Sequence, residues 1–152
     1  MNIDKLRYTG VEVQGGLGLG HGFSVGASWT HLHSKDVLDP SNPVGETYAD
    51  KLTGQLRYRS RGGRWWVEYA VRHNGEQKDV ALGTSPVGPV LPSFTVHAVR
   101  GGIRVLSIGP VTHTLSFALE NLTNRLYAEF ANVSFFRPEP ARTLTMTWTA
   151  GF

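Results

Sequence analysis

Residues 141–152 read ARTLTMTWTAGF, and large apolar side chains occupy every second position from Leu144 onward. Side chains of a β-strand point alternately to its two faces, so this stretch predicts a strand with one apolar and one polar face. The apolar face carries Leu144, Met146, Trp148, Ala150 and Phe152. The polar face carries threonines and a glycine, and the sequence ends on an apolar aromatic residue.

The composition favours a single β-rich domain. Glycine accounts for 18 of 152 residues, about 12% against a usual ~7%, and apolar residues reach only 40%. Because cysteine is absent, disulfides and thiolate metal sites are excluded. The net charge of +3 comes from scattered basic residues, which gives no footprint of nucleic-acid binding.

The sequence predicts neither a membrane-spanning helix nor a signal peptide. No run of 18 apolar residues predicts a transmembrane helix. The start, MNIDKLRYTG, has neither the apolar stretch nor the cleavage site of a signal peptide. Taken alone, these two features indicate a cytoplasmic protein, and the pattern of strands argues against that interpretation.

The same two-residue alternation recurs along the rest of the chain, whereas a helical period is nearly absent. It covers residues 6–19, 22–33, 49–60, 64–73, 94–106 and 111–122. With the last stretch, this predicts seven strands of roughly ten residues, close to the length that crosses a bilayer when tilted. In the fifth segment the alternation slips at Gly101 and Gly102, which predicts a β-bulge there.

The connections alternate between short and long. The short ones are 18–22, 60–64 and 107–111, and the long ones are 33–48, 73–93 and 123–142. An antiparallel meander gathers the short turns at one end, as in outer-membrane barrels. Four aromatic residues then fall at the short-turn end of the apolar face, in the manner of an interfacial girdle: Phe23, Tyr58, Trp65 and Phe152. The predicted fold class is therefore all-β, an antiparallel meander forming part of a transmembrane β-barrel of about seven or eight strands.

Three segments resemble TonB-dependent outer-membrane receptors. NIDKLRYTGVEV (2–13) resembles a strand opening of that family, and LENLTNRLYAEF (119–130) resembles a late motif. RPEPARTLTMTWTAGF (137–152) resembles the end of the barrel, a proline and arginine before the last strand and a final phenylalanine. The residues that match the family motifs are Asn121, Leu122, Asn124, Tyr127, Pro140 and Arg142. The resemblance identifies residues 1–152 as the C-terminal portion of a receptor barrel, without the family's plug domain and signal peptide.

The resemblance implies a location and a function. The chain would lie in the outer membrane of a Gram-negative cell and form part of the barrel wall. The whole receptor would take up a scarce nutrient, such as a ferric siderophore or cobalamin, without covalent chemistry or a cofactor. The implied partners are outer-membrane lipid, the barrel-assembly machinery, which would read Trp148 and Phe152, and the inner-membrane TonB complex, which would act only through the plug. Nucleic acid is not among them.

Other polar constellations give weaker indications. His31 and His33 share a strand face but lack a third metal ligand, and Glu68 and Glu120 have no candidate nucleophile beside them. Neither an enzyme nor a metal site is therefore expected. Glu68 is expected to pair with Arg57 or Arg72 across neighbouring strands. The aromatic residues of the last long connection are candidate ligand contacts: Tyr127, Phe130, Phe135 and Phe136.

Two alternatives remain open on the residues alone. If residues 125–136 form an eighth strand, the chain could close as a small barrel with a structural or adhesin role, since bacterial barrels have even strand numbers. A soluble β-sandwich that binds a ligand would show the same alternation of apolar and polar positions.

Overall fold

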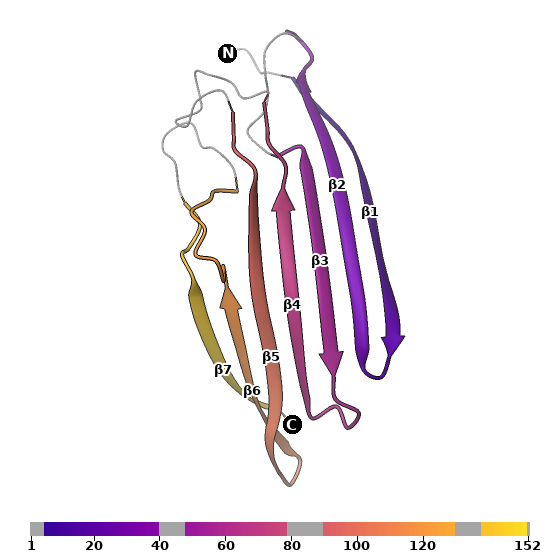
Figure 1. Cartoon of the computed structure of the whole chain (residues 1–152), viewed down its shortest axis with the longest axis vertical. Helices are drawn as coiled ribbons and strands as arrows, with labels where there is room; N and C mark the ends of the chain where they lie inside the picture. Colours follow the sequence, from indigo (N-terminus) through magenta and orange to yellow (C-terminus); the bar gives the residue numbers. More distant parts are fainter. Residues whose placement is uncertain (1–4, 40–47, 79–89, 130–137, 152) are drawn as a thin grey trace.

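The computed structural model describes residues 5–39, 48–78, 90–129 and 138–151, which form a single antiparallel β-sheet. Its seven strands are β1 (Leu6–Gly20), β2 (Phe23–Asp36), β3 (Asp50–Arg59), β4 (Trp65–Asn74), β5 (Phe94–Ile108), β6 (Val111–Glu120) and β7 (Thr143–Gly151). Each strand pairs with the next, in the order β1 to β7 (Figure 1). The predicted meander is confirmed.

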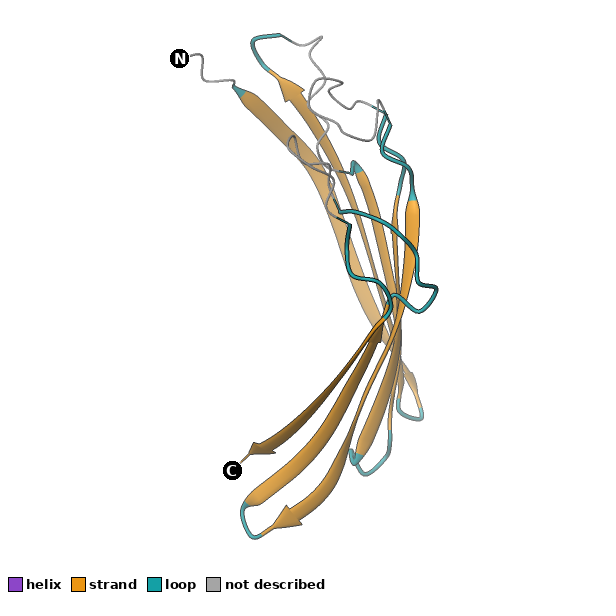
Figure 2. Cartoon of the chain, turned by 90° about the vertical axis from the view of Figure 1, so that its left-hand side faces the viewer, coloured by secondary structure: helices purple, strands orange, loops and turns teal. Residues whose placement is uncertain are grey.

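Three of the strands exceed the expected length of about ten residues. β1 and β5 contain 15 residues each and β2 contains 14, whereas β7 contains nine. Figure 1 shows the short turns gathered at the lower end of the sheet, and at the upper end the strand ends from which the long connections start. Figure 2 shows that the sheet is strongly curved.

The strand register aligns apolar residues across the whole sheet. Residues that pair directly in an antiparallel sheet lie on the same face. One such row is apolar from edge to edge: Leu17, Val25, Leu56, Tyr69, Val99, Leu119 and Leu144. We call the face that carries this row the outer face and the opposite one the inner face. The faces are those that the alternation predicts.

The predicted bulge is displaced from Gly101 and Gly102. Both glycines pair regularly, with Phe117 and Ser116, and the register shifts instead between Arg104 and Leu106. The shift changes the parity of β5, so that Ile103 before it and Leu106 after it both pair with outer-face residues of β6. Without it, Leu106 would point to the polar inner face.

The two glycines make room for aromatic side chains. A Cβ atom on Gly101 would lie 2.6 Å from the ring of Phe117, and one on Gly102 would lie 2.7 Å from the indole nitrogen of Trp66. Glycine in a strand often marks such a close approach rather than a bulge. The predicted bulge at Gly101 and Gly102 is therefore wrong, and these glycines allow the close approach of two aromatic rings instead.

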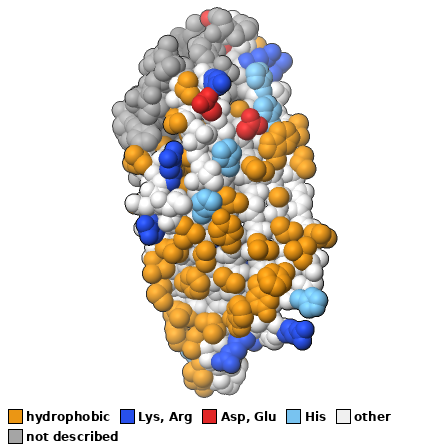
Figure 3. All heavy atoms as spheres, viewed as in Figure 1, with side chains coloured by type: hydrophobic (Ala, Val, Ile, Leu, Met, Phe, Trp, Pro, Cys, Tyr) orange, Lys and Arg blue, Asp and Glu red, His pale blue; other side chains and the backbone are white. Residues whose placement is uncertain are grey.

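Most large apolar side chains of the sheet are exposed rather than packed in a core. On the outer face Leu17 is 64% exposed, Met146 63% and Trp148 57%. In the part of the chain that the structure describes, no second sheet covers this face, as a β-sandwich would require. Figure 3 shows the result, a broad band of hydrophobic side chains over the middle and lower parts of the sheet.

A small buried cluster lies at the long-connection end. It contains Tyr48, Leu91, Phe94 and Val96, and Tyr127 packs against it. Among the described residues, 121–129 contain no strand. The remainder of the suggested eighth strand, 130–136, lies outside the described residues. No described helix is long and apolar enough to span a membrane.

Candidate functional site: the inner face and its latch

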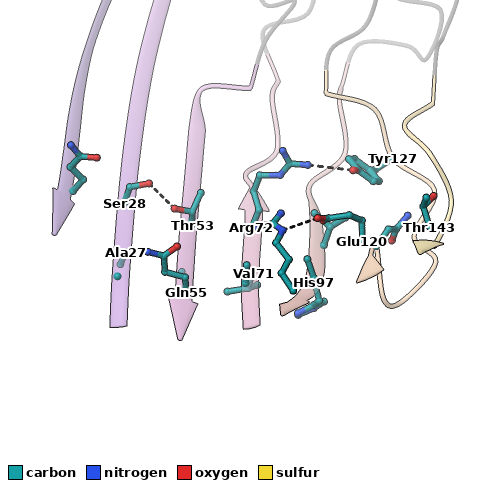
Figure 4. Close-up of a pocket in the computed structure, with 18 of the residues that line it drawn as sticks. Ala27, Ser28, Thr53, Gln55, Val71, Arg72, His97, Glu120, Tyr127 and Thr143 are labelled. Atoms are coloured by element: carbon teal, nitrogen blue, oxygen red, sulfur yellow. Dashed lines mark hydrogen bonds and ion pairs between the residues drawn. The ribbon is translucent and has the colours of Figure 1, made fainter. Parts of the chain in front are cut away.

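The inner face encloses a hollow of about 860 Å³ (Figure 4). Small and polar residues of the strands line its wall, among them Ser28, Thr53 and Gln55. The hydroxyls of Ser28 and Thr53 are 2.7 Å apart and hydrogen bonded across β2 and β3. The alternation that places large apolar side chains on the outer face thus leaves small and hydrogen-bonding side chains on the other side.

A charged group extends over three strands of this wall. The Arg100 guanidinium on β5 donates to the Glu120 carboxylate on β6 at 2.8 Å and to the Glu68 carboxylate on β4 at 3.4 Å. The expected pairing of Glu68 with Arg57 or Arg72 is therefore wrong. Arg57 instead lies over the ring of Trp66, at 4.3 Å from its centroid.

Arg72 joins the wall to the last long connection. Its guanidinium pairs with the carboxylate of Glu129 at 2.5 Å and donates to the hydroxyl of Tyr127 at 3.3 Å. The ring of Tyr127 packs at 4.6 Å from that of Phe94, between centroids. Burial raises the pKa of the Tyr127 phenol, against the opposing effect of the nearby Arg72 charge. The phenol therefore stays neutral at physiological pH and can accept from Arg72.

The neighbouring Tyr48 occupies a similar setting. Its ring meets that of Phe94 edge-on at 5.2 Å, and its hydroxyl donates to the carbonyl of Pro92 at 3.1 Å. Burial, and then the charge of Glu129, raise the pKa of Tyr48. The two tyrosines and Phe94 thus form an aromatic layer at the upper end of the inner face.

The residues that match the family motifs come together in a structure that we call the latch, residues 121–127 and 140–142. Asn121 is only 4% exposed. Its amide nitrogen donates to the carbonyls of Arg125 (2.9 Å) and Pro140 (3.1 Å), and its amide oxygen accepts from the Arg125 N–H (2.8 Å). These bonds join the chain leaving β6 to the chain entering β7.

Asn124 makes the second tie of the latch. Its side-chain oxygen accepts from the backbone N–H of Arg142 at 2.9 Å. Leu122 contributes its backbone N–H, which donates to the carbonyl of His97 on β5. Tyr127 accepts at its carbonyl from the N–H of Glu139. Sequence spacing could not show that residues about 18 positions apart meet here.

The other candidate residues are only partly described. Tyr127 lies among the residues lining the hollow, whereas Phe130, Phe135 and Phe136 lie outside the described residues. Trp148 is exposed on the outer face, where its indole N–H donates to His113 at 3.3 Å. Phe152 also lies outside the described residues.

Three of the predicted girdle aromatics form one contiguous cluster on the outer face. Ring centroids are 4.8 Å apart between Phe23 and Tyr58, and 4.9 Å apart between Tyr58 and Trp65. Elsewhere on this face His31 pairs with Asp50 at 2.9 Å. Over the described ranges no three potential ligands come together as a metal site.

The sequence analysis did not predict that Arg100 is the centre of the charged group. The alternation of the strands could have indicated it, because it places Arg100 on the same face as Glu68 and Glu120 and on the strand between theirs. The aromatic layer left no comparable signal, since Tyr48 and Tyr127 lie outside the strands and reach Phe94 only through the folding of the connections.

Comparisons with known proteins show the fold. No protein-family model matches the chain, and no curated protein matches its sequence. A solved structure named "Copper transporter OprC" is similar, with a TM-score of 0.74 and 20% sequence identity. The match covers 97% of this chain and 23% of that one. It supports the expected all-β fold, an antiparallel meander of seven strands.

Proposed function

We propose that this chain forms part of the barrel wall of a TonB-dependent outer-membrane receptor in a Gram-negative cell. The observation that carries the proposal is the contrast between the two faces of one sheet. The outer face exposes large apolar residues over all seven strands, and the inner face carries a hollow lined by small side chains together with polar and charged ones. This arrangement matches lipid outside and water inside.

The free energy of exposed apolar surface and of backbone hydrogen bonds also supports a location of the sheet in lipid. Exposed apolar area costs about 25 cal/mol per Å² in water, and lipid removes that cost. Backbone groups within the sheet are hydrogen bonded between strands, as hydrocarbon requires. The two edge strands, β1 and β7, each have one neighbour among the described residues. Further strands of a larger barrel would cover those edges.

The whole receptor would import a scarce nutrient. By the family resemblance the cargo is a ferric siderophore or cobalamin, and the name of the similar transporter adds copper to the candidates. In this proposal the chain supplies the wall and, through Tyr127 and Arg72, an aromatic and cationic contact at the upper end of the hollow. The reaction is transport, and the chain carries out no covalent chemistry.

The proposed partners follow from the same placement. Lipid would surround the outer face, and the barrel-assembly machinery would read Trp148 and Phe152 on the last strand. The inner-membrane TonB complex would act on the plug domain of the whole receptor rather than on this wall.

A pair of arginine substitutions on β3 tests the assignment of the two faces. Leu56 is 44% exposed on the outer face, and its neighbour Gln55 lies on the inner face beside the hollow. We expect Leu56→Arg to lower the free energy of unfolding in phosphatidylcholine bilayers by about 2–4 kcal/mol, because the charge enters hydrocarbon. Gln55→Arg, the matched control, should change it by less than about 1 kcal/mol. Urea titration of the vesicle-inserted chain measures both.

Two outcomes would contradict the proposal. Equal effects at the two positions would mean that the outer face does not meet lipid. A wild-type chain that unfolds cooperatively in plain buffer, without detergent or lipid, would favour the soluble β-sandwich.

A further inference from the structure

A group of basic side chains lies on the outer face at the long-connection end of β1 and β2. Arg7 pairs with Lys35 and Thr9 pairs with His33 in the strand register, and all four are exposed. All four side chains lie on the same face of the sheet as Trp29 and the apolar rows. Figure 3 shows basic and histidine side chains above the hydrophobic band over these two strands. We call Arg7, Lys35 and His33 the basic cluster.

The arrangement of the cluster is unfavourable by itself. Like charges directly opposite each other on neighbouring strands repel and destabilise a sheet. Among the ion pairs of the described residues none involves Arg7 or Lys35. An anion placed between the two side chains would convert the repulsion into attraction to a shared partner.

The distance between the basic cluster and the aromatic cluster, measured across the membrane, indicates which anion is within reach of the basic cluster. Lys35 and Phe23 lie on the outer face of the same strand, about twelve residues apart, or about 40 Å along the strand. A strand tilted by about 45° covers about 28 Å of membrane thickness over that length, close to the ~30 Å of a hydrocarbon core. With the aromatic cluster of Phe23, Tyr58 and Trp65 at one interface, the basic cluster reaches the headgroups of the other leaflet.

We infer that the basic cluster binds the phosphate of an anionic lipid headgroup in the leaflet at the long-connection end. This inference rests on the proposed function, since it requires the outer face to meet lipid. Arginine offers a planar fork of donors that matches phosphate oxygens, and lysine adds a compact charge. The apolar residues below, Val11, Val13 and Trp29, then contact the acyl chains of the same lipid.

A headgroup suits the site better than a protein partner. The three basic side chains come from adjacent rows of two neighbouring strands, a span that matches one or two phosphates. The row of Val11 and His31 comes next, and the apolar row of Val13 and Trp29 follows it. A ligand that fills both regions therefore carries a phosphate and hydrocarbon in one molecule. An anionic lipid has that composition.

Spin-labelled lipids test the inference on the full chain. The wild type is inserted into phosphatidylcholine vesicles, and electron spin resonance measures the motionally restricted fraction of spin-labelled phosphatidylglycerol and of spin-labelled phosphatidylcholine. We expect a preference of about fivefold for the anionic lipid, the attraction typical of a basic residue near a charged surface. In Arg7→Gln/Lys35→Gln the preference should fall to about one.

The matched control removes the same charge from the inner face, which does not meet lipid. Lys51 and Arg57 lie on the inner face of β3, and Lys51→Gln/Arg57→Gln should leave the preference within about 1.5-fold of wild type. Equal losses in both double variants, or no preference in the wild type, would overturn the inference. In either case restricted phosphatidylcholine would still support membrane insertion. A chain with no restricted lipid of either kind would refute the proposed function and this inference with it.

Discussion

At the scale of single residues, two asparagines decide how the last connection is held. Asn121 and Asn124 have positive φ angles of 50° and 52°, a left-handed conformation that asparagine tolerates better than most residues. The same residues use their side-chain amides to bind backbone groups across the latch. Asparagine therefore meets two requirements at each position, the backbone conformation and the hydrogen bonds.

Asn121→Gly separates these two requirements. Glycine adopts the positive φ freely, so only the side-chain hydrogen bonds are lost. We expect the free energy of local opening at the Arg125 amide to fall by about 1–3 kcal/mol, from the loss of three bonds in a buried site. Amide hydrogen exchange in detergent micelles measures it. Asn124→Gly is the control, since it should affect the Arg142 amide and spare that of Arg125.

An unchanged exchange rate at Arg125 in Asn121→Gly would mean that the side chain of Asn121 does not hold the latch. The family motif would then need another explanation than this local structure.

At the scale of elements, the tight turn between β1 and β2 depends on glycine for two distinct reasons. Gly20 and Gly22 have φ angles of +83° and +91°, which strain any residue with a Cβ atom. At Gly22 an added Cβ would also collide with the carbonyl oxygen of Arg59, whereas nothing lies within 4 Å of one at Gly20. The N–H of Arg59 donates to the carbonyl of Gly22, which fixes the close approach.

We expect Gly20→Ala to lower the free energy of unfolding by about 1–2 kcal/mol, the cost of a left-handed residue with a side chain. Gly22→Ala should cost at least ~1 kcal/mol more, because a backbone atom rather than a flexible side chain must move. Denaturant unfolding in micelles compares the two variants. Equal costs would show that the contact with Arg59 relaxes freely.

At the scale of the whole molecule, the sheet is open. β1 contacts β2 and β7 contacts β6, and the two edge strands do not contact each other. An open edge leaves alternate backbone groups without a partner strand. In the proposed function neighbouring strands of a larger barrel cover both edges.

The isolated chain should therefore show graded protection in micelles. We expect amide exchange to be slowest in β4, the central strand and the one farthest from both edges, and fast at alternate amides of β1 and β7. Mass spectrometry or NMR can read these rates. Full protection of both edge strands in a chain of monomeric mass would instead favour the self-closing barrel.

Much of the fold follows from the sequence by itself, because the two-residue period of a strand is a local property. The alternation in residues 141–152 and six other segments determined which side chains share a face, and the lengths of the connections determined the order of the meander. Tyr58 and Trp65 could be placed together on one rim because the short turn between β3 and β4 fixes the register of these two strands. Phe23 could be placed at the same end of the sheet because it directly follows another short turn.

Tertiary structure alone decided the contacts between segments distant in sequence. Arg100 was free to pair with several carboxylates until the register of β4, β5 and β6 placed it between Glu68 and Glu120. The shift at Arg104 to Leu106 follows from the need to keep apolar side chains on the outer face, and the glycines before it could not reveal it. The latch depends on where the connections fold back, which no local period encodes.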